Sequence, residues 1–367
     1  MTMVRIRHRS LPDLFQPTGP LLFLLLSSLL SAYIPSNAYG DVQSLIDQSN
    51  SLPEDKRQAI LLQETKKDPV VNWYTDMQPG NAQDVLKAAA DRYPFLKIEP
   101  VRLGHERLIN RVISEARAGR SIADVITAPA PSLNVLREAG IIARNLAPFR
   151  KTLRPGIADS QGWINPLSTT FYAVFYNTKL ARPGELPNRY EDLLLPRWKG
   201  MTAIDQEDAE WLAGLIETMG REKALDFAKK LSANEVNVRR GHTLLGQLVA
   251  GGESAIFPDQ YLHSGLELKK KGAPVDMYFI EPVLTQASKA VWISQNSSRP
   301  YAAMFFSDFL FSKEIQTMHA AFGRFASRRD VNLLYGLETK KIHYLSNDWA
   351  GGKYEELSTL FREIFAR

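Results

Sequence analysis

The sequence predicts an α/β fold divided into two lobes. From residue 70 onward, short apolar stretches of strand length alternate with longer segments whose apolar residues recur at helical spacing. This alternation is typical of a mostly parallel sheet that is covered by helices on both faces. The chain has 367 residues with 44% hydrophobic content, which is enough for two cores. It contains no cysteine, which excludes disulfides, thiolate metal sites and a cysteine nucleophile.

The first 38 residues have the pattern of an export signal. Three arginines precede a short apolar run at 21–30, and Ser36-Asn37-Ala38 offers small residues to signal peptidase. The apolar run is short for a helix that spans a bilayer, and it is followed by Pro35 rather than by a cluster of charges. We therefore expect cleavage near Ala38 and a periplasmic protein that is not inserted in the membrane. A membrane anchor that is retained after export is the alternative.

The elements of the first half follow in order. Residues 39–68 are expected to form a polar, partly helical lead-in that is broken at Pro53. Strands are then expected at 70–74, 97–101 and 124–126, and three helices alternate with them: one with Val85, Leu86, Ala89 and Tyr93 on one face, one over 105–118, and one that ends near Gly140.

The second half continues the same alternation. Strands are expected at 171–176, 201–204, 255–257, 275–280 and 290–293, and helices at 207–219, 221–231 and 243–250, with one more that ends at Lys271 and one that begins at Pro300. Proline suits the first helical turn because its missing N–H would be unpaired there in any case. The tail is expected to end in an amphipathic helix with Leu357, Leu360, Phe361 and Ile364 on one side.

Several function classes are disfavoured. The formal net charge is +5 and the basic residues are scattered, which argues against nucleic acid as a partner. The segment Gly252–Ile256 lacks the final glycine of a G-x-S-x-G elbow, and Ile109 replaces the closing histidine of an H-E-x-x-H motif. No Walker A or G-x-G-x-x-G sequence occurs. We expect a protein that is not an enzyme and needs no cofactor. A secreted hydrolase is the alternative if the protein is an enzyme.

Seven segments, in this order, resemble the bacterial extracellular solute-binding proteins of ABC importers, in the branch that includes ferric-iron binders. They are Lys66–Asp76, Ala123–Ser132, Ala173–Leu180, Tyr190–Gly200, Gln247–Phe257, Ala290–Ser294 and Arg299–Gln316. The resemblance spans about residues 66–331. It implies a type II periplasmic binding fold, in which two linker strands join two lobes and a solute is clamped between them.

The resemblance also implies a domain organisation and partners. The first lobe is expected to comprise residues 69–150 and 282–328, the second lobe residues 151–281, and residues 329–367 a helical tail that packs on the second lobe. Linker strands are expected near 169–175 and 279–282. The protein would act as a monomer that delivers its solute to an inner-membrane ABC permease and its ATPase. A periplasmic solute sensor that docks on a membrane receptor is an alternative.

The candidate binding residues lie where strands end and helices begin, because free N–H groups at helix N-termini face ligands there. Hydroxyl groups and arginine forks suit an anionic solute, whereas the acidic residues suit an amine or hydroxyls and leave a zwitterion or polyol open. The predicted ligand-binding residues are Thr75, Asp76, Ala130, Ser132, Thr169, Thr170, Asp205, Glu207, Arg240 and Tyr261.

The iron-binding members of the resembling branch hold ferric ion with adjacent tyrosines after the strand that matches residues 255–257. This chain has Tyr261 there, but Leu262 occupies the position of a second tyrosine. Ferric ion favours phenolate and carboxylate oxygens, so the loss of one donor argues against an unmodified iron site. We therefore predict a small organic anion and no metal, and keep a ferric-iron-binding protein as the alternative.

Overall fold

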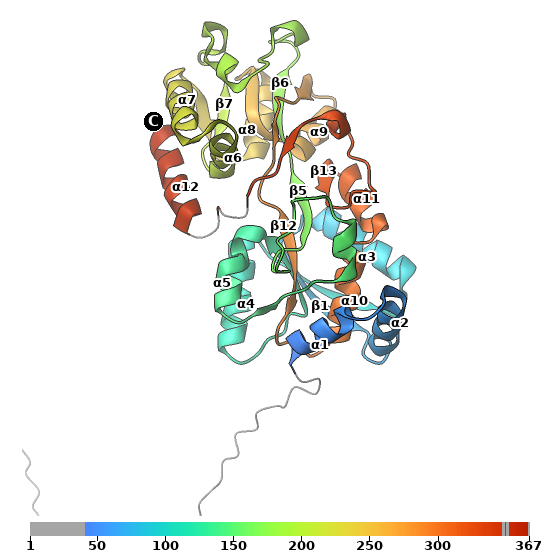
Figure 1. Cartoon of the computed structure of the whole chain (residues 1–367). Helices are drawn as coiled ribbons and strands as arrows, with labels where there is room; N and C mark the ends of the chain where they lie inside the picture. Colours follow the sequence, from blue (N-terminus) through green and yellow to red (C-terminus); the bar gives the residue numbers. More distant parts are fainter. Residues whose placement is uncertain (1–40, 347–348, 350–351, 366–367) are drawn as a thin grey trace, which may run out of the picture. The chain divides into compact units, whose positions relative to one another are not determined.

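Figure 1 shows the computed structural model, which describes residues 41–346, 349 and 352–365. The predicted export signal lies outside the described residues. Within these ranges, no helix is both long enough and apolar enough to cross a membrane.

Two helices form the predicted lead-in, α1 (Val42–Asn50) and α2 (Glu54–Thr65). The Asp41 side chain caps α1 by accepting a hydrogen bond from the backbone N–H of Gln43. Both helices pack against α10 (Pro300–Leu310), where Arg57 of α2 forms an ion pair with Asp308. This contact joins two segments that lie far apart in the sequence.

The larger sheet has seven strands. They are β1 (Val70–Thr75), β2 (Lys97–Arg102), β3 (Val125–Pro129), β4 (Ile142–Ala143), β5 (Pro166–Thr170), β12 (Lys289–Ser294) and β13 (Arg324–Ala326). Their order is β13-β5-β12-β3-β1-β2, and β4 pairs with β12. Only the β1–β2 and β1–β3 pairings are parallel, so the expectation of a mostly parallel sheet is wrong here. Strand β12 runs antiparallel to β3, and β5 runs antiparallel to both β12 and β13. Strands β12 and β13, which α10 and α11 connect, therefore point in the same direction on either side of β5.

Helices cover both faces of this sheet, as predicted. They are α3 (Pro79–Arg92), α4 (His105–Arg117), α5 (Leu133–Glu138), α10 and α11 (Lys313–Ala321). Side chains alternate along β1, so Trp73 packs in a core with α3 and α10 while Tyr74 packs in a separate core with α4. Both residues are fully buried.

The smaller sheet has the order β10-β6-β9. Its strands are β6 (Tyr172–Asn177), β9 (Ile256–Tyr261) and β10 (Val275–Tyr278), and a parallel pair, β7 (Ala203–Asp205) and β8 (Asn237–Arg239), lies beside them through a bridge from Thr202 to Ile256. The three-stranded sheet is antiparallel throughout, so the expectation of a mostly parallel sheet is wrong here also, because β9 and β10 both run against β6.

The remaining elements surround the smaller sheet or connect it. The helices are α6 (Ala209–Met219), α7 (Arg221–Ala233), α8 (His242–Gly251), α9 (Leu262–Lys270) and α12 (Gly352–Phe365), and the short strands β11 (Val283–Leu284) and β14 (Ile342–His343) pair with each other. Single 3-10 turns occur at Ala130–Ser132, Pro148–Thr152, Pro183–Glu185, Tyr190–Leu194, Pro196–Trp198 and Leu337–Thr339. Helix α12 is the amphipathic helix expected in the tail, and its Leu357 and Phe361 are buried in one core with residues of α6 and α7.

Two segments carry the chain between the sheets. Phe171 alone separates β5 of the larger sheet from β6 of the smaller one, and it forms an antiparallel bridge with Thr285 of the returning segment. The Thr169 hydroxyl donates to the Gln286 carbonyl at 2.7 Å. The two crossings are therefore paired with each other. Strand β5, which lies in the range expected for the second lobe, belongs to the larger sheet by its pairing with β12 and β13.

Candidate functional site

A cavity of about 430 Å³ lies where the two crossings and the ends of several strands meet. We call it the central cavity. Both sheets contribute to it, and three helices, α3, α8 and α9, begin beside it. Its lining comprises Asp76, Met77, Gln78, Pro129, Ser168, Thr169, Thr170, Glu210, Gly241, His242, Thr243, Tyr261, His263, Ser264, Gln286, Ala287, Lys289, His319 and Arg324.

One part of the lining is positively charged. Lys289 of β12, whose side chain is 17% exposed, forms an ion pair with Asp76, and burial lowers the pKa of its ammonium group. Arg324 of β13 donates to the Thr170 hydroxyl at 3.1 Å, and burial lowers the pKa of its guanidinium group. Two cations thus face the cavity with one carboxylate between them, so the positive charge is only partly neutralised.

Two histidines beside these cations have free hydrogen-bonding capacity. Both ring nitrogens of His319 and the Nδ1 atom of His263 are buried and have no hydrogen-bond partner among the described residues. Burial and the nearby Arg324 charge lower the pKa of each imidazole to about 3, so both rings are neutral. A buried polar atom without a partner costs free energy. These nitrogens are shielded from the cavity surface, so a solute would reach them only after the surrounding side chains move.

The part of the lining that α6 contributes is acidic. Glu210 of α6 is half-buried, and its Oε2 atom accepts a hydrogen bond from the backbone N–H of Ala287 at 3.1 Å. Burial, and then the charge of Asp208, raise the pKa of Glu210 to about 8. Among the described residues, Glu210 takes part in no ion pair within 4.0 Å.

Behind this acidic wall, His242 is held between buried carboxylates. Its Nδ1 atom lies 2.9 Å from Asp205 and its Nε2 atom 2.9 Å from Asp208. Burial opposes the charged ring, but the hydrogen bonds to the two carboxylates outweigh it and raise the pKa of His242 to about 10. The Tyr261 ring stacks on the imidazole with 3.5 Å between centroids. His242 is therefore a buried imidazolium in the wall of the cavity.

One group of residues has the composition of a metal site. Donor atoms of Asp208, His242 and Asp259 all lie within 4.8 Å of one another. Both nitrogens of His242 are already bonded to carboxylates, however, and burial raises the pKa of Asp259 well above its usual range. In this arrangement the imidazolium itself serves as the counter-ion of the carboxylates.

The central cavity brings together four of the ten residues predicted from the sequence: Asp76, Thr169, Thr170 and Tyr261. Asp205 lies behind the wall, where it bonds His242.

The other five predicted residues do not line the central cavity. Thr75 accepts a hydrogen bond from the Met77 N–H, the Ala130 N–H donates to Ser288, and Ser132 bonds His105. Arg240 forms an exposed ion pair with Glu207 at 2.9 Å.

The lining residues that the sequence reasoning missed include Glu210, His263, Lys289, His319 and Arg324. Lys289 and Arg324 share one sequence signal, since each is a basic residue at the start of a short apolar strand. The two histidines and Glu210 carry no comparable signal, because each sits within or at the start of an amphipathic helix where a surface position is the ordinary expectation.

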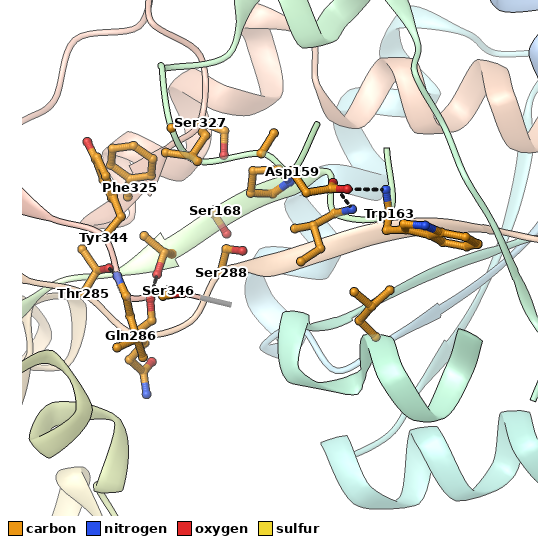
Figure 2. Close-up of a pocket in the computed structure, with 18 of the residues that line it drawn as sticks. Asp159, Trp163, Ser168, Thr285, Gln286, Ser288, Phe325, Ser327, Tyr344 and Ser346 are labelled. Atoms are coloured by element: carbon orange, nitrogen blue, oxygen red, sulfur yellow. Dashed lines mark hydrogen bonds between the residues drawn. The ribbon is translucent and has the colours of Figure 1, made fainter. Parts of the chain in front are cut away.

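A second cavity of about 780 Å³ is larger (Figure 2). Ser168, Thr169 and Gln286 line both cavities, so the crossing segments contribute to a wall of each. Its Asp159 carboxylate is occupied by the backbone N–H groups of Trp163 and Ile164. The lining is otherwise rich in hydroxyl groups and aromatic rings, and its two cations, Arg137 and Lys353, are exposed, whereas Lys289 and Arg324 of the central cavity are partly buried. Size alone therefore does not identify the solute site, and the charged central cavity is the better candidate.

The geometry is that of a protein with a polar cavity between two sheets. The family described as bacterial extracellular solute-binding protein matches residues 120–350, which is more than half of the chain. The chain belongs to this family. The resemblance stated from the sequence is thereby confirmed, as is the expectation of a solute-binding protein rather than an enzyme. No curated protein matches the chain in sequence.

Solved structures share the fold. Iron-bound HitA from Pseudomonas aeruginosa is 20% identical with a TM-score of 0.67, over 80% of this chain and 99% of that one. Trichodesmium IdiA (FutA) with iron and citrate is 21% identical with a TM-score of 0.66, over 81% and 98%. AfuA from Actinobacillus pleuropneumoniae with fructose-6-phosphate is 20% identical with a TM-score of 0.65, over 81% and 98%. The described chain is thus an α/β protein with mixed sheets that matches periplasmic binding proteins in fold.

Proposed function

We propose that this protein is the substrate-binding component of an ABC importer and binds a small organic solute with an anionic group in the central cavity. The observation that carries the proposal is that two cations, Lys289 and Arg324, line one wall of the cavity beside the neutral imidazoles of His263 and His319. Carboxylates and phosphates bind such groups through charge-assisted hydrogen bonds. The volume of about 430 Å³ lies within the range of small-molecule sites.

The proposed mechanism is closure of two lobes around the solute. The first lobe is built on the larger sheet and comprises residues 69–150 and 282–328, to which strand β5 is added, and the second lobe comprises the rest of 151–281 with the tail 329–367 packed on it. The crossings near Phe171 and Thr285 act as the hinge. A solute that touches both lobes binds the closed form more tightly than the open form, and this difference drives closure. The permease would recognise the closed form in the periplasm.

Ferric iron is the second candidate, and the comparisons favour it over an organic anion, because two of the three structures described above contain iron. The specific observation in this chain is that Tyr261, Asp76 and Glu210 all line the central cavity. Phenol and carboxylate oxygens are the donors that ferric ion prefers. The partners of these groups favour the anion instead, since Asp76 is paired with Lys289 and the Tyr261 hydroxyl accepts from Gln286 at 2.6 Å.

A thermal-shift panel on protein freed of bound ligand separates the two candidates. The panel contains fructose 6-phosphate, alkyl phosphonates, dicarboxylates, citrate, ferric citrate and ferric nitrilotriacetate. A solute at about 100 times its Kd stabilises the folded state by about 2.7 kcal/mol, which is a readily measured rise in Tm. Stabilisation by metal-free anions supports the proposal, whereas stabilisation by ferric salts alone, abolished in Tyr261→Phe, would establish the second candidate.

Variants assign the binding groups. Lys289→Gln and Arg324→Gln should each weaken an anionic solute by about 1.5–3 kcal/mol, the usual worth of a hydrogen bond to a charged group. Arg221→Gln is the matched control, because Arg221 is exposed and pairs with Glu356 outside the cavity. Arg240→Ala tests a residue predicted from the sequence, and an unchanged affinity would remove Arg240 from the site.

A further inference from the structure

We propose that the solute is a zwitterion, with an anionic group that Lys289 and Arg324 bind and a cationic group that Glu210 binds. The inference rests on the proposed function and specifies the chemical class of the solute. It starts from the separation of charge in the lining of the central cavity, where cations come from β12 and β13 and the carboxylate comes from α6.

Glu210 is placed to receive a cation. One of its oxygens is fixed by the Ala287 N–H at 3.1 Å, which leaves the remaining acceptor positions of the carboxylate for other partners. It lines the cavity and forms no ion pair within 4.0 Å among residues 41–346, 349 and 352–365. Its raised pKa of about 8 keeps Glu210 mostly protonated at pH 7 in the free protein, and an ammonium group on the solute would favour the ionised form and pair with it.

The residues behind Glu210 increase the negative potential at this wall. Asp205 and Asp208 both bond to the single imidazole of His242, and their side chains are only 3% and 2% exposed. One imidazolium neutralises one of these two carboxylates, so a net negative charge remains beside α6. Buried charges of one sign project a potential into an adjoining cavity. That potential favours a cationic group on the bound solute at the same end.

The wall that β12 and β13 contribute has the reverse balance. Lys289 and Arg324 face the cavity, and Asp76 is the carboxylate paired with Lys289. The excess there is positive. A solute with only an anionic group would satisfy this wall and leave Glu210 unpaired, and a purely cationic solute would do the opposite. A zwitterion satisfies both walls, which is the condition for electrostatic complementarity.

Matched pairs of probes test the inference by calorimetric titration. Each pair differs by one amine: O-phosphoethanolamine and ethyl phosphate, taurine and ethanesulfonate, 4-aminobutyrate and butyrate. For at least one pair, we expect the amine-bearing member to bind about tenfold tighter or more. This is the ratio of dissociation constants that one charge-assisted hydrogen bond produces. Glu210→Gln should abolish this ratio while leaving the amine-free member within about threefold, since glutamine retains an oxygen for the Ala287 N–H.

Two further variants keep the outcomes distinct. Lys289→Gln should weaken both members of a pair equally, and Glu222→Gln, an exposed residue of α7, should change neither. Equal binding of both members in the native protein overturns the zwitterion and leaves the anionic solute standing. Binding of diamines such as putrescine through Glu210, without any bound anion, overturns both the zwitterion and the anionic solute. Failure of every anion, with stabilisation by ferric salts, overturns the proposed function and this inference together.

Discussion

His242 combines a buried position with two carboxylate partners, and this makes its protonation part of the stability of the fold. The pKa of its ring rises from 6.5 to about 10 in the folded protein. A raised pKa contributes stability that is fully present below the unfolded value and is lost as the pH passes through the folded value. The imidazolium therefore stabilises the protein at neutral pH and ceases to do so in alkaline solution.

The first prediction follows from this linkage. The free energy of unfolding of the unliganded protein should fall as the pH rises from 8 to 10, and the fall should be smaller in His242→Gln. Urea denaturation at several pH values measures both slopes. The comparison begins at pH 8 because of Glu210, whose pKa is raised from 4.5 to about 8. Its ionisation reduces the free energy of unfolding as the pH rises toward 8 and has little further effect above it. Equal slopes in the two proteins between pH 8 and 10 would contradict the role of His242.

Glu210 gives a second prediction, on binding rather than stability. Burial and the charge of Asp208 raise the pKa of Glu210, and burial, helped in turn by the charge of Glu210, raises the pKa values of Tyr172, Tyr261 and Tyr354. With a pKa of about 8, Glu210 is mostly protonated at pH 7 in the free protein, and an ammonium group on the solute favours its ionised form.

Binding of an amine-bearing anion at pH 7 should therefore release a proton. Titration calorimetry in buffers with different ionisation enthalpies counts this proton, and the affinity should rise from pH 6 to 8. The release should disappear in Glu210→Gln. Proton release that persists unchanged in this variant would assign it to another group.

At the scale of elements, helix α9 lies unusually close to the smaller sheet. A Cβ atom at Gly265 would lie 2.4 Å from the Met277 sulfur and 3.0 Å from the Phe175 ring. Glycine at this position therefore lets α9 approach β6 and β10. Because α9 begins directly after Tyr261, at Leu262, this approach also fixes where the tyrosine and His263 meet the cavity.

The third prediction tests this close contact. Gly265→Ala should destabilise the protein by about 1–3 kcal/mol, the usual cost of overpacking a core. Gly251→Ala is the control within α8, because a Cβ atom there meets nothing within 4 Å. Chemical denaturation compares the two variants. If Gly265→Ala lost no more unfolding free energy than Gly251→Ala, α9 would be able to shift and accept the added methyl group without destabilising the protein.

At the scale of the whole molecule, the two crossings are the segments that would bend when the lobes close around a solute. Phe171 and Thr285 pair with each other, and the adjoining Thr169 and Gln286 line the central cavity. A change in the dihedral angles of these few residues would move one sheet against the other. The proposed hinge and the proposed site thus share residues.

The fourth prediction concerns closure. Saturation with the solute should decrease the radius of gyration measured by small-angle X-ray scattering, because the lobes close around the solute. Lys289→Gln, at a solute concentration too low to saturate it, should keep the larger radius. An unchanged radius in the saturated native protein would rule out a hinge closure large enough to alter the dimensions of the molecule.

The sequence alone predicted much of the fold. Apolar runs and helix-spaced faces correctly indicated β1, β2, β3 and β12 and helices such as α4 and α7, because these signals arise within a few neighbouring residues. The strand directions were predicted only in part: β1, β2 and β3 run parallel as expected, but most of the other pairings are antiparallel. Antiparallel pairing of β5, β12 and β13 depends on where the crossings lead the chain, and the residues of a strand carry no record of its partner's direction.

What the sequence determined by itself is the α/β class, membership of the solute-binding family and four of the residues that line the central cavity, Asp76, Thr169, Thr170 and Tyr261. These features depend on local pattern and on the order of segments along the chain. Only the tertiary structure decided the charge of the cavity. Lys289, Arg324 and Glu210 come from three elements that the two sheets bring together, and electrostatic interactions depend on distance and burial in space rather than on separation in the sequence.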